Sequence, residues 1–296
     1  MAQPNVAVAC CRRTKGGDPK DLYPDPDAAP LQAALGAFGA RSTLVAWDDP
    51  DVDWDSFSHI LISSTWDSVD RPAEYLSWAR RVTALSTLVN PSAVIEWGLD
   101  KVHQRDLAAA GVPVIPTVWV GPDEDWSALP MGEFVVKPSV SAGGRETARY
   151  APGDRGALDQ VKALQERGQT VMVQEYVASI DDRGEVDLIF LDGTFSHAVA
   201  KMPVLRVGEG VVERPWERMA WAGLTSPSGG QRAVAERTMT IVAERVGSLP
   251  VYSRVDLVSG CAGEPLLLEV EVVDPNLSFD MEHSAAARLA KALLRR

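Results

Sequence analysis

Two strongly apolar segments near the end of the chain, 251–258 and 266–273, carry charged side chains at alternate positions. The first segment contains Arg254 and Asp256, and the second contains Glu269 and Glu271. Because successive side chains of a β-strand point to opposite faces, each charged pair lies on one face of its strand. If the two strands pair, the sequence predicts three carboxylates and one guanidinium on a single surface.

Such a cluster is costly to bury, because like charges repel and each carboxylate loses its hydration. A hard divalent cation offsets this cost, and Mg²⁺ binds carboxylate oxygens together with nucleotide phosphates. Asp256, Glu269 and Glu271 are therefore the predicted metal ligands. The alternative is a solvated strand face on which Arg254 neutralises Asp256, but the apolar flanking residues favour a central strand.

The size and charge of the chain limit the classes of protein to which it can belong. With 296 residues, 46% of them hydrophobic, the chain can bury an ample core in about two domains or lobes. Its net charge of −12, with dispersed basic residues, argues against a nucleic-acid partner. No segment has the length of a membrane span or the pattern of an export signal, so we expect no membrane partner. Cys10, Cys11 and Cys261 show no paired spacing, which favours a reducing, cytoplasmic compartment.

The pattern of apolar segments predicts an α/β protein with three portions. Residues 1–98 alternate strands with helices and predict a small parallel α/β unit, with strands at 6–10, 42–46 and 60–62 and helices at 31–38 and 72–87. A central lobe, 99–180, has predicted strands at 117–120, 134–138 and 171–176 and a helix at about 158–167. A C-terminal lobe, 181–296, has a predicted hairpin at 186–201, a helix at 234–246, the two charged strands and a helix at 285–294. Residues 205–230 are interpreted as a long irregular loop, either functional or disordered.

The motifs of several common enzyme classes are absent. The sequence contains no G-x-x-x-x-G-K-[ST] phosphate loop, G-x-G-x-x-G turn, H-E-x-x-H, C-x-x-C or G-x-S-x-G. The four histidines are scattered and are expected to be structural or exposed: His59, His103, His197 and His283. Hydride transfer, zinc hydrolysis and serine-nucleophile chemistry therefore lack their usual residues.

A lysine at the end of an apolar strand, Lys137, precedes the small residues 139–144. At that position a lysine can meet a ligand at the sheet edge, and backbone amides of small residues can approach phosphate oxygens closely. A glycine-rich hairpin turn is an equally good interpretation of this segment alone. The segment 174–177 ends another strand and can offer backbone groups to a planar base.

The order of these motifs resembles that of the ATP-grasp superfamily of ligases. The matching elements are Asp100-Lys101 with Gly111-Val112-Pro113, Val136-Lys137-Pro138 with its glycine-rich loop, Gln174-Glu175-Tyr176-Val177, Gly184-Glu185-x-Asp187, Arg254-x-Asp256 and Glu269-x-Glu271. The resemblance covers about residues 100–276 and implies an ATP-grasp fold preceded by the N-terminal α/β domain. It also implies ATP and Mg²⁺ as cofactors and a small, amino-acid-like substrate whose carboxylate is activated for attack by nitrogen.

The resemblance implies a role for each matching residue. Those implied to bind nucleotide are Lys101 and Lys137 at the α- and β-phosphates, the loop of Ser141, Gly143 and Gly144 over the triphosphate, Glu175, Tyr176 and Val177 at the adenine, and Glu185 at the ribose. Asp256, Glu269 and Glu271 would ligate Mg²⁺. Arg254 would stabilise charge on the reacting acyl group, and Lys201 would meet the γ-phosphate. Many superfamily members have Glu-x-Asn where this chain has Glu269-x-Glu271, and Asn276 is the second candidate for that ligand.

A narrower resemblance concerns a subgroup of small bacterial ATP-grasp proteins, the D-cycloserine synthetases of antibiotic biosynthesis. The matching segments are Trp47-Asp48-Asp49-Pro50, Ser64-Thr65-Trp66-Asp67, Asn90-Pro91 and Trp97-Gly98-Leu99-Asp100-Lys101. This resemblance implies that ATP phosphorylates O-ureido-D-serine and that its own ureido nitrogen attacks the acyl phosphate. The tryptophans have an alternative interpretation as core residues.

Three other functions stay open at this point. An intermolecular carboxylate–amine ligase would share every motif above. A non-catalytic, regulatory nucleotide-binding protein predicts damage among the motif residues, and none of Lys101, Lys137, Arg254, Asp256 and Glu269 is replaced. A periplasmic-type binding protein would need an export signal and would not need the carboxylates. Self-association is also left open.

Residues on the substrate side are harder to predict. Ligands of open α/β sheets lie at the carboxyl ends of strands, which makes Tyr23, Ser64, Thr65 and Asp67 candidates. Arg206, Arg214 and Arg218 of the long loop could meet a carboxylate, but a solvated surface position is favoured for each.

Overall fold

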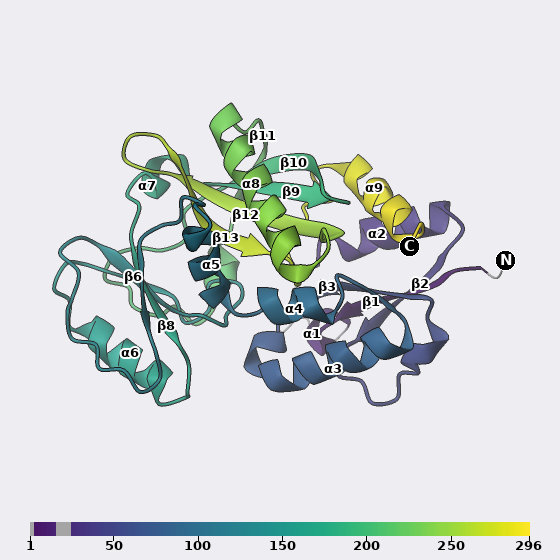
Figure 1. Cartoon of the computed structure of the whole chain (residues 1–296), viewed down its shortest axis with the longest axis horizontal. Coiled ribbons are helices and arrows are strands. Elements are labelled where there is room, and N and C mark those ends of the chain that lie inside the picture. Colours follow the sequence, from purple (N-terminus) through teal and green to yellow (C-terminus); the bar gives the residue numbers. More distant parts are fainter. Residues whose placement is uncertain (1–2, 16–24) are drawn as a thin grey trace.

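Three β-sheets organise the chain in a computed structural model that describes residues 3–15 and 25–296 (Figure 1). The strands are β1 Asn5–Cys10, β2 Arg41–Ala46, β3 His59–Ser64, β4 Thr87–Val89, β5 Thr117–Val120, β6 Phe134–Pro138, β7 Ala148–Tyr150, β8 Val171–Glu175, β9 Glu185–Leu191, β10 Thr194–Lys201, β11 Trp221–Thr225, β12 Tyr252–Ser259 and β13 Pro265–Glu271. The α-helices are α1 Arg12–Lys15, α2 Ala28–Ala37, α3 Pro72–Leu85, α4 Ser92–Gly98, α5 Gln104–Ala109, α6 Gly156–Gln165, α7 Ile180–Arg183, α8 Gly229–Val246 and α9 His283–Leu293. Short 3₁₀ turns occupy Trp54–Ser56, Ser68–Asp70, Lys101–His103 and Pro215–Arg218.

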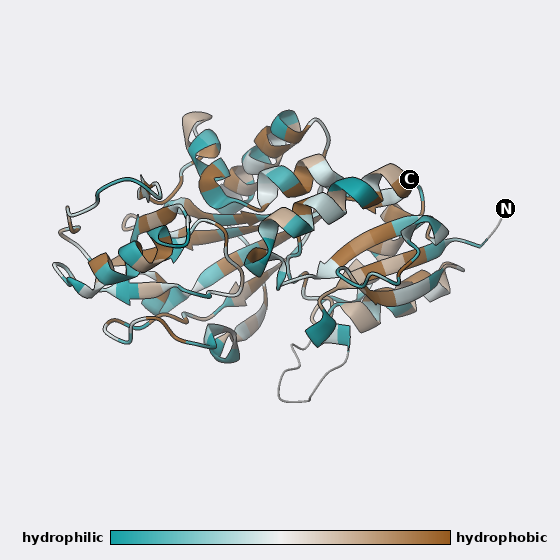
Figure 2. Ribbon diagram, turned by 90° about the horizontal axis from the view of Figure 1, so that it is seen from below, coloured by the Kyte–Doolittle hydropathy of each residue, from teal (hydrophilic) through white to brown (hydrophobic). Residues whose placement is uncertain are grey.

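The N-terminal sheet is parallel and has the order β2-β1-β3-β4, which confirms the predicted α/β unit. Its strands are mostly brown in the hydropathy view, consistent with a sheet covered by helices (Figure 2). Helix α3 begins at Pro72, where the missing N–H costs nothing, and ends at Leu85. The predicted extension of this helix to Thr87 is wrong, because Thr87–Val89 form the edge strand β4 against β3.

The central sheet is antiparallel and has the order β5-β8-β6-β7. Helix α6 packs on this sheet and shares a hydrophobic core with it that contains Phe134, Val161 and Val173. Two inner strands of this sheet, β6 and β8, carry Lys137 and Glu175 near their ends. The sheet therefore presents the predicted nucleotide-side residues along neighbouring strands.

The C-terminal sheet has the order β11-β10-β9-β12-β13. Its β9–β10 hairpin is turned, as predicted, by Asp192 and Gly193, whose φ angles of 51° and 72° suit a tight hairpin. The prediction of an irregular loop over 205–230 is partly wrong, because β11 pairs with the edge of β10 and a 3₁₀ turn precedes it. The glycine at position 223 and the shortness of the strand hide β11 from a search for alternating apolar residues.

The last helix, α9, returns to the N-terminal unit and packs against α2 (Figure 1). Leu289 and Ala286 of α9 share one hydrophobic core with Leu35 of α2 and Val8 of β1. The division of the chain at 98/99 and 180/181 stays a prediction. No helix in the described ranges combines the length and apolarity that a membrane span requires.

A single buried asparagine ties the N-terminal unit to the charged strands. Asn90 follows β4 with a positive φ of 59°, which asparagine tolerates better than most side chains. Its amide donates to the carbonyls of Tyr252 and Val272 at 2.9 and 2.8 Å, and its oxygen accepts from the N–H of Val251 at 2.7 Å. Asn90 thus sets where β12 and β13 lie relative to the N-terminal sheet.

We expect Asn90→Ala to lower the free energy of unfolding by at least about 2 kcal/mol, because each buried group left unpaired costs roughly 1–3 kcal/mol. Denaturant titration measures this loss. Asn5→Ala, which removes an exposed amide bonded to the carbonyl of Ser56, is the control and should change stability by less than about 1 kcal/mol. Equal losses in the two variants would contradict the junction role of Asn90.

Candidate functional site

A cavity of about 480 Å³ is lined by strands of the central and C-terminal sheets and by residues outside the strands of the N-terminal unit, among them Trp66 and Val69. The predicted site residues that line it are Lys101, Lys137, Ser141, Gly143, Gly144, Glu175, Tyr176, Val177, Glu185, Lys201, Arg254, Glu269 and Glu271. Asp256 lies beneath the lining, 1% exposed, opposite Glu269 in the β12–β13 register. The structure therefore brings the residues predicted from scattered motifs to one place.

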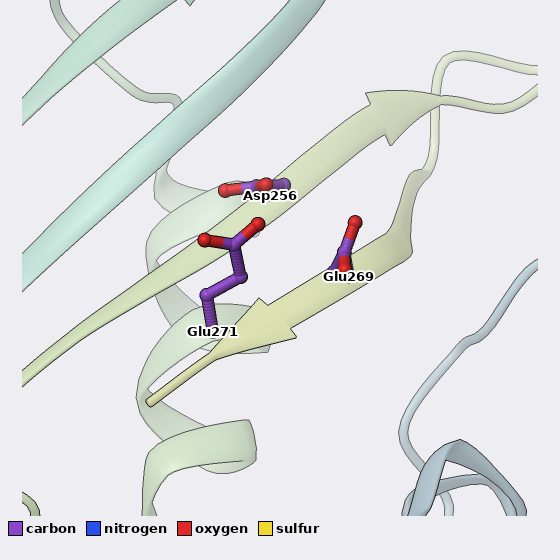
Figure 3. A group of neighbouring side chains, drawn as sticks. All are labelled: Asp256, Glu269 and Glu271. Atoms are coloured by element: carbon purple, nitrogen blue, oxygen red, sulfur yellow. The ribbon is translucent and has the colours of Figure 1, made fainter. Parts of the chain in front are cut away.

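The three predicted metal ligands converge on one face of β12 and β13 (Figure 3). Each of Asp256, Glu269 and Glu271 offers an oxygen, and these oxygens lie within 4.8 Å of one another. All the donors are carboxylates, which suits a hard divalent cation such as Mg²⁺. The geometry and the chemistry of this donor set fit a magnesium ion.

The cluster is electrostatically strained without a cation. Burial raises the pKa of Glu271 to about 8, although Arg254 opposes the rise, and Glu269 and Asp256 add repulsion. Burial would also raise the pKa of Glu269, but Lys101 and Lys137 lower it to about 2. The raised pKa of Glu271 reflects the negative electrostatic potential at its carboxyl group. A divalent cation bound there would offset that potential.

Arg254 lies at the centre of this charge cluster. Its guanidinium contacts Asp256 at 2.7 Å and Glu271 at 2.8 Å, and it donates to the carbonyl of Asn276 at 3.3 Å. Asp187, on β9, lies 3.7 Å from Arg254 and has no hydrogen-bond partner for either carboxylate oxygen among the described residues. Burial raises the pKa of Asp187 to about 7, with repulsion from Asp256 added. Asp187 belongs to a matching motif but has no role predicted from the sequence, because an apolar strand pattern does not show which partner a buried carboxylate meets.

Three lysines approach the cavity in different states of pairing. Lys101 follows its cap residue Asp100 and contacts Glu269 at 2.9 Å and the carbonyl of Ser141 at 2.6 Å. Lys201 contacts Glu185 at 2.6 Å. Lys137 is 7% exposed and has neither an ion pair nor a side-chain hydrogen bond within the described part of the chain. Burial lowers its pKa, so this lysine is the cation of the cavity with the most to gain from an anionic ligand.

The glycine-rich loop is fastened to the N-terminal unit. Gly143 and Gly144 have φ angles of 62° and 70°, which glycine adopts without strain. The next residue, Arg145, contacts both carboxylate oxygens of Asp70 at 3.1 Å and donates to the carbonyl of Trp66. Arg145 was not predicted as a site residue, because its partners come from a distant part of the sequence.

The strand end at 174–177 offers a free backbone donor. The N–H groups of Glu175 and Tyr176 are taken by the carbonyls of Pro116 and Glu133, whereas the N–H of Val177 has no partner among the described residues. Arg149 covers the ring of Tyr176 at 3.4 Å from its centroid. The predicted adenine segment therefore has one donor for a planar base and a ring that a buried guanidinium holds in place.

The substrate-side candidates are only partly brought to the cavity. Ser64, Thr65 and Asp67 do not line it, but their neighbour Trp66 does, and Tyr23 lies outside the described residues. The loop arginines pair with nearby glutamates at the surface, as the sequence analysis favours: Arg206 with Glu209, Arg214 with Glu217 and Arg218 with Glu209. Of the tryptophans in the segments of the narrower resemblance, Trp47 is a core residue, Trp97 packs partly buried against another core, and Trp66 lines the cavity. Asn276 lines the cavity, and its Oδ1 accepts from the N–H of Ser278 at 2.8 Å; its place as the second candidate ligand stays a prediction.

Comparisons of sequence and of structure with known proteins find similarity to the same protein, DcsG. Residues 6–90 match the N-terminal domain of the D-cycloserine synthetase DcsG. The chain is 36% identical over 291 residues to the cycloserine biosynthesis protein DcsG of Streptomyces lavendulae, covering 94% of this chain and 96% of the relative. A crystal structure of D-cycloserine synthetase DcsG superposes with a TM-score of 0.87 at 34% identity, covering 99% of both chains. The ATP complex of D-alanine–D-alanine ligase from Bacillus anthracis has a TM-score of 0.66 at 11% identity, with 99% and 96% covered, which shows the shared fold alone.

We expect Mg²⁺ to raise the melting temperature of the wild-type protein in the presence of a non-hydrolysable ATP analogue. Glu271→Gln keeps the shape of the side chain and removes one negative charge, so its Mg²⁺-dependent shift should be smaller. Its melting temperature without metal should not fall, because burial already disfavours the ionised form of Glu271. Differential scanning fluorimetry measures both quantities, and Glu264→Gln at an exposed turn is the control. An undiminished Mg²⁺ shift in Glu271→Gln would exclude this carboxylate as a ligand.

Proposed function

Because this chain belongs to the family of the D-cycloserine synthetase DcsG and has the ATP-grasp fold of a ligase, we propose that it closes the ring of O-ureido-D-serine at the expense of ATP. The observation that carries the proposal is the complete charged set around the cavity. It combines the carboxylates of β12 and β13, the unpaired Lys137 and the central Arg254. These groups suit a triphosphate, a divalent cation and a carboxylate that becomes activated.

The phosphate side of the site is proposed as follows. Lys101, Lys137 and the backbone amides of Ser141 to Gly144 bind the phosphates, and the free N–H of Val177 meets the adenine edge. Asp256, Glu269 and Glu271 would hold Mg²⁺, which neutralises phosphate charge when bound. Lys201 and Glu185 stay proposed contacts for the γ-phosphate and the ribose, which would require their mutual ion pair to loosen.

The bond changes balance with these residues as the electrostatic frame. A carboxylate oxygen of the substrate attacks the γ-phosphorus of ATP, and ADP leaves. The ureido nitrogen that is bonded to oxygen then attacks the acyl carbon, its proton goes to the departing phosphate, the bond between the acyl carbon and phosphate breaks, and a five-membered ring forms. Water afterwards hydrolyses the bond between the ring nitrogen and the carbamoyl carbon, which leaves N–H on the ring and releases carbamic acid, which breaks down to carbon dioxide and ammonia. Arg254 stabilises the negative charge on the acyl group, and the short distance between the two reacting groups of one bound substrate favours attack within the molecule.

The size of the cavity favours a small-molecule substrate. A volume of about 480 Å³ is within the usual range for small-molecule sites.

We also infer a cytoplasmic location, because Cys10, Cys11 and Cys261 are all free thiols.

The decisive measurement is ADP release with ATP, Mg²⁺ and either O-ureido-D-serine or its L-enantiomer, followed by mass analysis of the product. We expect ADP, phosphate and a cyclised product with the D-enantiomer alone. Turnover that requires two separate substrates and yields a joined product would replace the proposal with an intermolecular ligase. Tight ATP binding without turnover would favour a non-catalytic, regulatory protein.

We expect Lys137→Ala to lower kcat/KM by at least about 100-fold, because it removes a buried cation from a phosphate contact. Lys162→Ala is the matched control: this lysine lies on an exposed position of α6 and should leave kcat/KM unchanged. Steady-state kinetics with ATP varied measures both variants. A loss below about threefold in Lys137→Ala would exclude its phosphate contact.

A further inference from the structure

Asp274 is a carboxylate of the cavity that forms no ion pair with a lysine or arginine of the described ranges. Four other carboxylates of the lining face a lysine or an arginine: Glu185 faces Lys201, Glu269 faces Lys101, and Asp187 and Glu271 face Arg254. Glu175 and Asp280 make no ion pair with the described residues either, but both are exposed. Asp274 also lines the cavity, yet it makes no ion pair with any residue that the structure describes. Burial raises its pKa to about 6, although the hydrogen bond from Thr65 and the charges of Lys101 and Arg145 oppose the rise. Such a group gains from a cation supplied by a ligand.

A hydrogen-bond relay holds the side chain of Asp274 in one orientation. The hydroxyl of Thr65 donates to Oδ2 of Asp274 at 2.8 Å. The single proton of the Thr65 hydroxyl is used in that bond. The hydroxyl of Tyr75, 2.8 Å away, must therefore donate to the hydroxyl oxygen of Thr65. The indole of Trp66 donates to the backbone carbonyl of Asp274 at 3.1 Å. The relay fixes one carboxylate oxygen and leaves Oδ1 without a hydrogen-bond partner among the described residues.

Asp274 lines the same cavity as Arg254, which limits the groups of a bound substrate that it can contact. It lies three residues beyond Glu271, where the chain leaves β13, and it lines the cavity together with Arg254 and Trp66. In an α-amino acid, the ammonium group is attached to the carbon next to the carboxylate. A substrate whose carboxylate is activated beside Arg254 must therefore place its ammonium group close by.

We propose that Asp274 binds the α-ammonium group of the amino-acid substrate, with Thr65 and Trp66 as positioning residues. The inference rests on the proposed function and adds the group that selects an α-amino acid over a simple carboxylic acid. A ligand without the ammonium group would leave Asp274 unpaired in a poorly hydrated place, which disfavours that ligand. The N-terminal unit contributes to specificity through this relay, because Thr65 and Tyr75 are both buried in it.

The first test compares Asp274→Asn with the wild type. We expect the KM for O-ureido-D-serine to rise about 10- to 100-fold, because a hydrogen bond between charged groups is replaced by a neutral contact. The KM for ATP and the melting-temperature shift caused by an ATP analogue should not change. Asp123→Asn is the control, since Asp123 is exposed and does not line the cavity, so both KM values should stay near those of the wild type.

The second test measures kcat/KM for wild type and Asp274→Asn, each with O-ureido-D-serine and with 3-(ureidooxy)propanoate, which lacks only the ammonium group. These four values form a thermodynamic cycle like that of a double mutant. We expect the analogue to lose most of its kcat/KM with the wild type and to lose little more with the variant, because both changes remove one contact. Thr65→Val, which frees Asp274 from its relay, should raise the KM for the substrate by a smaller factor and provides a second variant.

The possible outcomes distinguish a failure of the role of Asp274 from a failure of the proposed function. Independent, multiplicative losses in the cycle would overturn the role of Asp274 and leave the proposed function intact. An unchanged KM for the amino-acid substrate in Asp274→Asn would also overturn the role of Asp274. So would a change in the KM for ATP or in the Mg²⁺ dependence of the variant, because Asp274 would then act on the nucleotide side. If the wild type releases no ADP with any amino acid offered, the proposed function fails, and the role of Asp274 fails with it.

Discussion

The charge cluster on β12 and β13 is the constraint on which the rest of the structure depends. Asp256, Glu269 and Glu271 share a face inside the molecule, and Arg254 alone cannot neutralise them. Repulsion within this group is offset by cations that other elements supply, including Lys101 at 2.9 Å from Glu269. The central sheet and the 3₁₀ turn at Lys101–His103 therefore have to lie against this face. The cavity is the space that remains between these opposed charges.

The N-terminal unit is held to that cluster by polar contacts as well as by packing. Asn90 pairs with the backbone beside β12 and β13, and the buried carboxylate of Asp27 accepts the N–H groups of Leu277 and Phe279 at 2.5 and 2.8 Å. Helix α9 adds apolar contacts with α2. Because breaking a buried polar contact leaves unpaired groups, these contacts make the relative position of the sheets specific, whereas apolar packing alone would tolerate sliding.

The parts that sequence reasoning predicted are those encoded locally. The alternation in 251–258 and 266–273 predicted that the carboxylates converge if the two strands pair, and the strands do pair; Asp192-Gly193 predicted the hairpin turn. The edge strands β4, β7 and β11 were missed, because three to five residues with weak alternation gain their order from a partner strand. Arg145 and Asp274 were missed for a related reason, since their partners Asp70 and Thr65 lie 75 and 209 residues away.

The same division between local and distant contacts bears on how specificity arises in this fold. The likeness to D-alanine–D-alanine ligase, at 11% identity, extends over 99% of this chain, so the arrangement of sheets cannot by itself select a substrate. Groups suited to phosphate and metal belong to the central and C-terminal sheets and to the segment at Lys101. The N-terminal unit lines the cavity with few residues, chiefly Trp66 and Val69, and reaches it otherwise through the contact of Thr65 with Asp274. A substrate side built from so few groups can discriminate only by charge and close fit, which suits a ligand of amino-acid size.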